Sequence, residues 1–298
     1  MAIMKKLILS EEWEKGEAFR QSSLKYMREH PYSPEHWEEQ KRKNDEIRRQ
    51  NIDGQMPRLI VIPDVHGRTF WKKALDSDLP VVFLGDYLDP YPDEGITPED
   101  ALQNFRDIIA FARENPDRVT LLLGNHTLHY IGLSADAARF DYDNSREIYS
   151  LIRDNKPLFQ FAFRWGDTLL THAGVNSFWL ESHDIADDIE AIEKHLNRNW
   201  EISDRFLDDP LYLGCLKDDR GEISRSRGGR YLVGSPDWND LRDMFDSSCL
   251  QGYIQVFGHT QLCKTGAVFA YDNWICCDSR EAFVWNGKEL SVFQPDLA

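Results

Sequence analysis

Three short apolar runs in the first half of the chain constrain its fold most. RLIVIP begins at Arg58, PVVFLG at Pro80 and RVTLLLG at Arg118. Unbroken apolar runs of this length are typical of strands buried on both faces. Between the second and third runs lies Thr97–Asn115, which opens with a capping-box-like Thr-Pro-Glu-Asp and repeats apolar residues at helical spacing. This alternation predicts βαβ units, in which helices cover the faces of a sheet.

Hairpin patterns dominate the later part of the chain. Residues 157–174, PLFQFAFRWGDTLLTHAG, predict two strands that turn at Trp165–Asp167. Near the C-terminus, Asn286-Gly287 separates two apolar runs, which is a strong hairpin signal. A further helix is expected at about Asp143–Asp154. Because βαβ units come first and hairpins last, the order favours a two-sheet sandwich flanked by helices over a pure Rossmann fold.

Composition divides the chain into an N-terminal extension and a main domain. Residues 1–56 predict an extension with helices at about Ser10–Arg28 and Ser33–Arg49, the second of which is polar on nearly every face. We interpret it as a solvated helix packed by one edge on the main domain, with a partner-binding arm as the alternative. Residues 57–298 are the expected main domain. Within it, about 184–250 are rich in Asp and Arg, carry few strand signals and are expected to cap the site.

Charge and composition exclude several classes of protein. The 298 residues carry a net charge of −16, from 35 Lys and Arg against 51 Asp and Glu. Such a surface repels phosphate backbones and argues against broad nucleic-acid binding. No apolar stretch is long enough to span a bilayer, and the N-terminus reads poorly as a signal peptide. The five cysteines form no CxxC pair, which favours reduced thiols and a cytoplasmic protein.

Side chains that can bind metals stand where the predicted strands end. They are Asp64, His66, Asp86, Asn125, His172 and His259. Taken singly, each residue is better explained by a structural role, since a lone histidine beside a strand is usually a core residue and a lone Gly-Asp is usually a turn. Together they supply enough carboxylate, amide and imidazole ligands for two ions at the edge of the sheet where ligands gather. Mixed oxygen and nitrogen ligands suit Mn, Fe or Zn better than Ca or Mg.

In this order the motifs resemble those of the calcineurin-like metallophosphoesterases, whose pattern is DxH, GDxxD, GNH, H and GH. The match spans about Ile60–Thr260. The resemblance implies an α/β (α+β) fold, the four-layer α/β/β/α double β-sandwich. It also implies two divalent ions, for which manganese is the expected metal and iron or zinc the alternatives. One ion would bind Asp64, His66 and Asp86, and the second would share Asp86 and add Asn125, His172 and His259.

Three departures from the family pattern bear on the substrate. The last motif is often GHxH, but here Gln261 replaces the second histidine, which is similar to the protein phosphatase and dinucleoside tetraphosphatase branches. Those branches usually have an arginine after GDxxD and often an acidic residue after GNH, where this chain has Pro90 and Thr127. We therefore expect the phosphate to be held by the loop Ser224–Trp238. The candidate substrate-binding residues are Arg225, Arg227 and Arg230.

The residues predict a hydrolytic mechanism. Two neighbouring divalent ions would share a water and lower its pKa, and the bridging hydroxide would attack phosphorus. By the resemblance, His126 does not bind metal. It would protonate the leaving oxygen, oriented by Asp89. His129 is interpreted as a supporting or structural residue.

The expected activity is hydrolysis of phosphomonoesters, on a phosphorylated small molecule or a phosphoprotein. A dinucleoside polyphosphate hydrolase is the nearest alternative. A phosphodiesterase or nuclease is disfavoured by Gln261 and by the net charge. A non-catalytic scaffold on the same fold would require broken ligand motifs, and none of the six ligands is missing.

Overall fold

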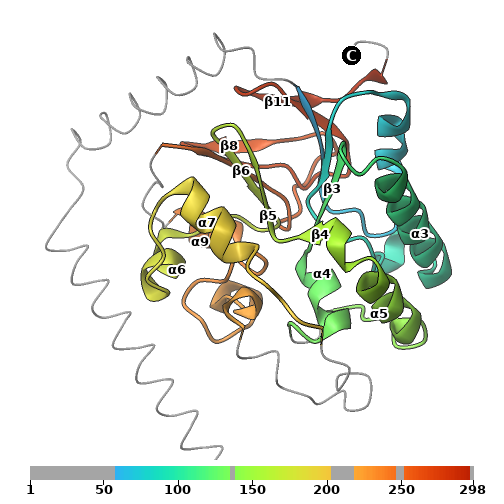
Figure 1. The fold of residues 1–298 in the computed structure, drawn as a ribbon, viewed down its shortest axis with the longest axis horizontal. Coiled ribbons are helices and arrows are strands. Elements are labelled where there is room, and N and C mark those ends of the chain that lie inside the picture. Colours follow the sequence, from blue (N-terminus) through green and yellow to red (C-terminus); the bar gives the residue numbers. More distant parts are fainter. Residues whose placement is uncertain (1–57, 135–137, 203–217, 246–251, 296–298) are drawn as a thin grey trace, which may run out of the picture.

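Two β-sheets face each other in the computed structural model, and helices lie on their outer sides (Figure 1). The structure describes residues 58–134, 138–202, 218–245 and 252–295. The helices expected at Ser10–Arg28 and Ser33–Arg49 lie outside the described residues.

The first sheet has the strand order β11-β10-β1-β2-β3-β4. Its strands are β1 (Leu59–Ile62), β2 (Val81–Phe83), β3 (Val119–Leu122), β4 (Phe159–Gln160), β10 (Phe283–Trp285) and β11 (Leu290–Val292). Strands β1 to β4 are parallel, as the βαβ pattern predicts. The hairpin predicted at Asn286-Gly287 is confirmed, because β10 and β11 pair antiparallel on either side of it.

The second sheet has the order β5-β6-β7-β9-β8. Its strands are β5 (Ala162–Trp165), β6 (Thr168–Thr171), β7 (Ile254–Phe257), β8 (Phe269–Tyr271) and β9 (Trp274–Cys276). The predicted turn at Trp165–Asp167 is confirmed, since β5 and β6 pair antiparallel across it. Strands β6, β7 and β9 are parallel, so the carboxyl ends of β6 and β7 share one edge with each other.

Helices cover the outer faces of both sheets. The helices of the described residues are α3 (Pro98–Glu114), α4 (Asn125–Leu128), α5 (Ser145–Asp154), α6 (Ser177–Ser182), α7 (Ile189–Leu196) and α9 (Leu241–Phe245), of which α4 lies at the end of β3. Short 3₁₀ turns lie between them, η1 (Phe70–Asp76), η2 (Pro92–Glu94), η3 (His129–Ile131), η4 (Lys156–Leu158), η6 (Asp219–Gly221) and η7 (Arg225–Arg227). The predicted cap of α3 is confirmed, because the Thr97 hydroxyl accepts a hydrogen bond from Asp100 N and the Asp100 carboxylate accepts one from Thr97 N.

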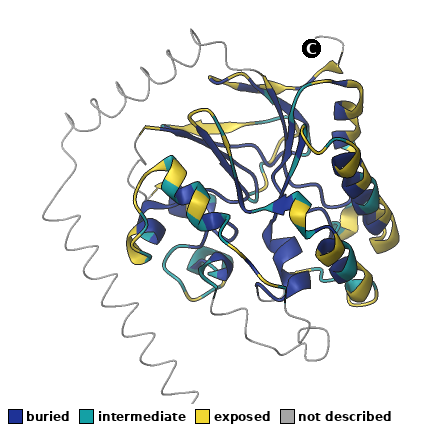
Figure 2. Ribbon diagram, viewed as in Figure 1, coloured by how far each residue is buried: buried dark blue, intermediate teal, exposed yellow. Residues whose placement is uncertain are grey.

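Alternation along the strands separates two hydrophobic layers. In β1, Leu59 and Val61 belong to the core between the sheets, with Val82 of β2 and Val256 of β7. The intervening Ile60 and Ile62 belong to the larger core that includes residues of α3 and α5. Figure 2 shows the same arrangement, with buried strands inside and the helices exposed on their outer faces. The four-layer α/β/β/α fold expected from the sequence is therefore confirmed.

Within the described ranges, no helix combines the length and the apolar character that a bilayer crossing requires. Three cysteines lie in these ranges, Cys263, Cys276 and Cys277, and all three are free thiols.

Candidate metal centre

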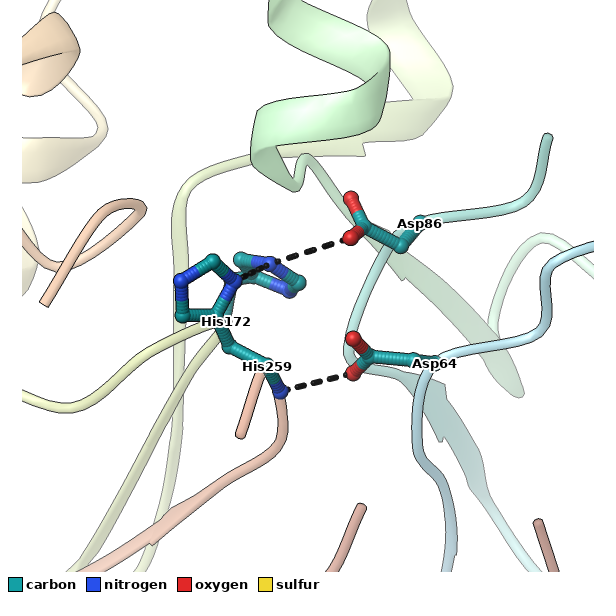
Figure 3. Close-up of side chains that lie close together, drawn as sticks. All are labelled: Asp64, Asp86, His172 and His259. Atoms are coloured by element: carbon teal, nitrogen blue, oxygen red, sulfur yellow. Dashed lines mark hydrogen bonds and ion pairs between the residues drawn. The ribbon is translucent and has the colours of Figure 1, made fainter. Parts of the chain in front are cut away.

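Polar side chains from both sheets meet at the carboxyl ends of the strands. Asp64 follows β1, Asp86 follows β2, His172 follows β6 and His259 follows β7. These four residues are buried, and one ligand atom from each lies within 4.8 Å of the others (Figure 3). The prediction that strand-end residues gather at one place is therefore confirmed for these four.

The other predicted ligands join the same cluster. Asn125, the first residue of α4, directs Oδ1 to within 2.9 Å of His172 Nε2. His66 Nε2 lies 3.9 Å from Asp64 Oδ2 and 3.7 Å from Asp86 Oδ2. Asp86 belongs both to the group with Asp64, His172 and His259 and to a group with His66 and His126. Its carboxylate therefore stands at the junction of the two groups.

Backbone hydrogen bonds aim the ligand atoms. The Nδ1 nitrogens of His66 and His172 lie 2.8 Å from the carbonyl oxygens of Leu88 and Leu84, respectively. A carbonyl can only accept, so each Nδ1 carries the proton and each Nε2 presents a lone pair towards the cluster.

The two carboxylates are oriented in the same manner. Asp64 Oδ1 accepts a hydrogen bond from His259 N at 2.8 Å, and Asp86 Oδ1 accepts one from His126 N at 2.9 Å. Because Oδ1 is used by the backbone in both cases, Oδ2 of each is the oxygen that faces the neighbouring histidines. These bonds also tie the loop after each strand to a carboxylate on another strand.

The glycines of the GNH and GH motifs are required by close approach. A Cβ atom on Gly124 would overlap Asp86 Oδ1 and lie 2.8 Å from the His172 ring. A Cβ atom on Gly258 would overlap Asp64 Oδ1. The backbone can approach the carboxylates this closely only where no side chain intervenes.

The spacing of the ligand atoms fits a divalent cation. His172 Nε2 lies 3.0 Å from His259 Nδ1 and 3.5 Å from Asp86 Oδ2. Ligands bound at about 2.1 Å to one ion lie roughly 3.0–3.4 Å apart in tetrahedral or octahedral geometry. The donor set also contains no cysteine, so a closed thiolate site is excluded for this cluster.

Electrostatics also favour a cation at this position. Burial raises the pKa of Asp64 to about 6, and the neighbouring charge of Asp86 adds to the effect. Burial lowers the pKa of His66 to about 3, so its imidazole is neutral near pH 7 and can act as a ligand. Two buried carboxylates so close together repel each other, and a metal ion would neutralise them.

A second cluster surrounds the predicted acid pair. His126 Nδ1 lies 2.6 Å from Asp89 Oδ2, so Nε2 of His126 is not used in this contact. His129 Nε2 lies 2.9 Å from the same carboxylate oxygen. The Tyr130 hydroxyl donates to Asp89 Oδ1. Burial alone would raise the pKa of Asp89, but the hydrogen bonds from His126 and His129 outweigh it and lower the pKa to about 2.

Sequence reasoning missed the third partner of Asp89. His129, which the sequence indicates as a supporting residue, contacts Asp89. Tyr130 follows His129 directly in the GNHTLHY segment and is the partner that the motifs do not indicate. No local pattern links it to Asp89, which lies 41 residues away in the chain.

The three predicted phosphate-binding arginines are not equivalent in the structure. Arg227 lies beside the cluster, where Nη2 donates to Thr260 Oγ1 at 2.6 Å and Nε pairs with Asp240 at 2.7 Å. Arg230 is exposed, and its guanidinium lies 5.1 Å from the Tyr231 ring centroid. Arg225 is half-buried. Among the described contacts of these three arginines, those of Arg227 reach Thr260 and the backbone of His259.

A buried carboxyl that the sequence did not single out lies near the same cluster. Asp237 is 1% exposed, and neither of its side-chain oxygens has a hydrogen-bond partner among the described residues. Burial raises the pKa of Asp237 well above its usual range. The adjacent Trp238 packs edge-on to His259, with ring centroids 6.0 Å apart. The SPDW segment gave no signal of its own beyond lying in the predicted arginine loop.

Comparison with solved structures gives matches at low sequence identity. A cold-active protein-tyrosine phosphatase of a psychrophile Shewanella species is 19% identical, with a TM-score of 0.48 over 79% of this chain and 77% of that chain. A protein serine/threonine phosphatase from Saccharomyces cerevisiae is 15% identical, with a TM-score of 0.43 over 89% of each chain. Identities and TM-scores this low do not identify a substrate. No curated protein matches the chain.

Comparison with family models identifies the family of the chain. The model of the calcineurin-like phosphoesterases matches residues 57–263, most of the chain and all of the residues gathered in the two clusters. The chain therefore belongs to the calcineurin-like phosphoesterase family and is a metal-dependent phosphoester hydrolase.

Proposed function

We propose that the protein is a phosphomonoesterase that uses two divalent ions, with manganese the favoured metal and iron or zinc the alternatives. The observation that carries this proposal is the position of Asp86 Oδ2, which lies 3.7 Å from His66 Nε2 and 3.5 Å from His172 Nε2, so that one carboxylate is close to a histidine of each proposed ligand set. A carboxylate has two oxygens and can bridge two cations, whereas a single imidazole cannot.

The two ions would divide the ligands between them. The first would bind Asp64, His66 and Asp86. The second would share Asp86 and add Asn125, His172 and His259. The contacts among Asn125, His172 and His259, between 2.9 and 3.0 Å, support the second group as one coordination sphere.

When bound, the ions would neutralise the phosphoryl oxygens and lower the pKa of water, which generates the nucleophile near neutral pH. Side chains of the protein would protonate the leaving group. His126 is held by Asp89 through Nδ1 at 2.6 Å, so a protonated His126 could donate from its other nitrogen to the departing oxygen. The carboxylate fixes the orientation of the His126 ring. The bonds from His129 and Tyr130 hold Asp89 itself in place.

The surroundings of Gln261 support a monoester substrate over a diester. With its amide oriented so that oxygen faces Arg280, Gln261 accepts from Nη2 at 2.5 Å and from Nε at 3.2 Å. The residue that replaces the second histidine of GHxH is therefore engaged with Arg280. By the resemblance to the protein phosphatase branch, a site with the single His259 suits monoesters.

Arg227 is the favoured substrate contact within the predicted loop, because it lies against Thr260 and next to His259. Arg225 and Arg230 stay weaker candidates. We further propose that residues 57–298 form the catalytic domain and that 1–56 are a separate extension. The free thiols in the described residues support a reducing, cytoplasmic location.

Substrate comparison in metal-loaded protein tests the proposal. The protein is stripped with a chelator, reloaded with Mn²⁺, Fe²⁺ or Zn²⁺, and assayed on p-nitrophenyl phosphate, bis-p-nitrophenyl phosphate and diadenosine tetraphosphate. We expect metal-dependent turnover of the monoester, with the diester slower by a large factor. Asp107→Asn, a surface carboxylate change on α3, serves as the matched control. Faster turnover of either other substrate would reject the monoester assignment, and no turnover of any would favour the scaffold.

A further inference from the structure

Position 90 leaves the site without the arginine that the resemblance led us to expect after GDxxD. Pro90 cannot contact a phosphate through a charged side chain. However, Arg139, from a different part of the chain, reaches this position. Arg139 Nε donates a hydrogen bond to the carbonyl oxygen of Asp89 at 2.9 Å, so its guanidinium lies at the residue directly before Pro90.

Aromatic stacking fixes the direction of this guanidinium. Arg139 Cζ lies 3.9 Å from the centroid of the Tyr91 ring. The Tyr91 ring in turn packs edge-on to His66, with centroids 5.1 Å apart. The Tyr91 ring therefore lies between the guanidinium of Arg139 and the proposed metal ligand His66. A cation held over a ring face loses little of its capacity to bind an anion, since the planar edge of the guanidinium stays available.

The neighbouring arginines form ion pairs with carboxylates, unlike Arg139 in the interactions described for it. Arg68 pairs with Glu94 through Nε at 2.6 Å, and Arg280 pairs with the same carboxylate at 3.0 Å. Arg227 pairs with Asp240 at 2.7 Å. The interactions described for Arg139 are with a neutral carbonyl and a neutral ring.

One nitrogen of Arg139 also has no acceptor. Nη2 is buried and has no hydrogen-bond partner among the described residues. A buried donor on a charged group is costly to leave without an acceptor, so a site that retains one is suited to an anionic ligand. Arg139 also lines a cleft of about 640 Å³ with Leu88, Asp89 and Phe140.

We propose that Arg139 binds the phosphoryl group of the substrate, in place of the arginine that Pro90 excludes. This inference rests on the proposed phosphomonoesterase function and adds a substrate-binding residue to it. The guanidinium fork would donate to phosphoryl oxygens that face away from the ions, with the Asp89 carbonyl and the Tyr91 ring holding it in place.

Inorganic phosphate is the probe that tests whether Arg139 binds a phosphoryl group, and its binding can be measured without turnover. Its affinity for Mn²⁺-loaded protein is measured by calorimetry and, where turnover occurs, as a competitive inhibition constant. Arg139→Ala should weaken phosphate binding and raise KM by about 10- to 100-fold, the usual effect of losing a hydrogen bond to a charged group. Metal content should be unchanged. Arg139→Lys should recover part of the affinity, since it keeps the charge but not the fork. Arg106→Ala, an exposed α3 arginine paired with Glu147, is the matched control.

The outcomes separate this inference from the proposed function. Phosphate affinity within about twofold of wild type in Arg139→Ala would overturn it. So would a fall in kcat with phosphate affinity unchanged, because that pattern means Arg139 only positions Asp89. If the wild type binds phosphate through Arg139 but hydrolyses no monoester, the proposed function fails and this inference stands. If Arg139→Ala does not fold, Arg139→Gln and Arg139→Lys give the same comparison of neutral against charged side chains.

Discussion

Replacing Asp89 by asparagine should reduce turnover without removing metal. The substitution preserves shape, and asparagine tolerates the left-handed backbone that Asp89 adopts at φ 59°. What is lost is the negative charge that holds His126 Nδ1 at 2.6 Å. A hydrogen bond to a charged group is worth about 1.5–3 kcal/mol, which corresponds to a roughly 10- to 100-fold fall in kcat. KM and metal content should change little.

The same change should lower stability by a related amount. The pKa of Asp89 falls from 3.8 to about 2 in the folded protein. At about 1.4 kcal/mol for each pH unit, this difference contributes about 2–3 kcal/mol of stability. Because the folded pKa is the lower one, the contribution is present above pH 4 and is lost as the pH falls towards 2. Urea unfolding at pH 7 should therefore show Asp89→Asn destabilised by a similar amount, and the difference should shrink in acid.

A double-mutant cycle decides whether Asp89 acts through His126. His126→Ala should lower kcat by about 10²- to 10⁴-fold, as expected for loss of a general acid. Adding Asp89→Asn to His126→Ala should cost little more, because residues that act as one unit are not additive. Stopped assays on metal-loaded variants give kcat, and plasma mass spectrometry gives metal content. Fully additive effects, or loss of metal from His126→Ala, would refute the assignment of an acid pair.

Three further results follow from the geometry. Gly258→Ala should abolish or severely weaken metal binding measured by calorimetry, because its Cβ would overlap Asp64 Oδ1, and retained affinity would show that the loop can yield. The metal affinity of the stripped protein should decrease below about pH 6, because burial raises the pKa of Asp64 to about 6 and a protonated carboxyl must release its proton to bind metal. A metal affinity that does not change between pH 5 and 7 would contradict this. Asp218→Asn should destabilise the fold by about 2–4 kcal/mol in urea, because Arg220 is 2% exposed and loses the carboxylate charge together with one of its two bonds, of 2.6 and 2.8 Å, to this side chain. No loss of stability would mean that Arg220 finds another partner.

Much of the fold could be predicted because its signals are local. Each buried strand is a continuous apolar run, and α3 carries both its cap and its periodicity within one segment. The metal-binding side chains could be predicted for the same reason. Each follows a strand directly, and parallel strands bring their carboxyl ends to one edge. The glycines that permit the close approach are part of the same short motifs.

Contacts between distant segments could not be predicted in this way. Arg139 reaches Asp89 across 50 residues of sequence, and Tyr130 reaches it across 41. Neither contact leaves a periodic trace, because each depends on how a loop folds back over the sheet edge. The arginine loop shows the same limit, since composition selected Arg225, Arg227 and Arg230 alike, while packing against Thr260 distinguishes Arg227.

Metal content of the wild type and of Asp86→Asn tests the central claim most directly. If the Asp86 carboxylate bridges two ions, the wild type should bind two Mn²⁺ per chain. Asp86→Asn should lose at least one, with monoester turnover falling to background and the fold retained by circular dichroism. Asp107→Asn should bind two ions and keep full activity. A wild type that saturates at one ion, or an Asp86→Asn variant that binds two and turns over normally, would contradict the account.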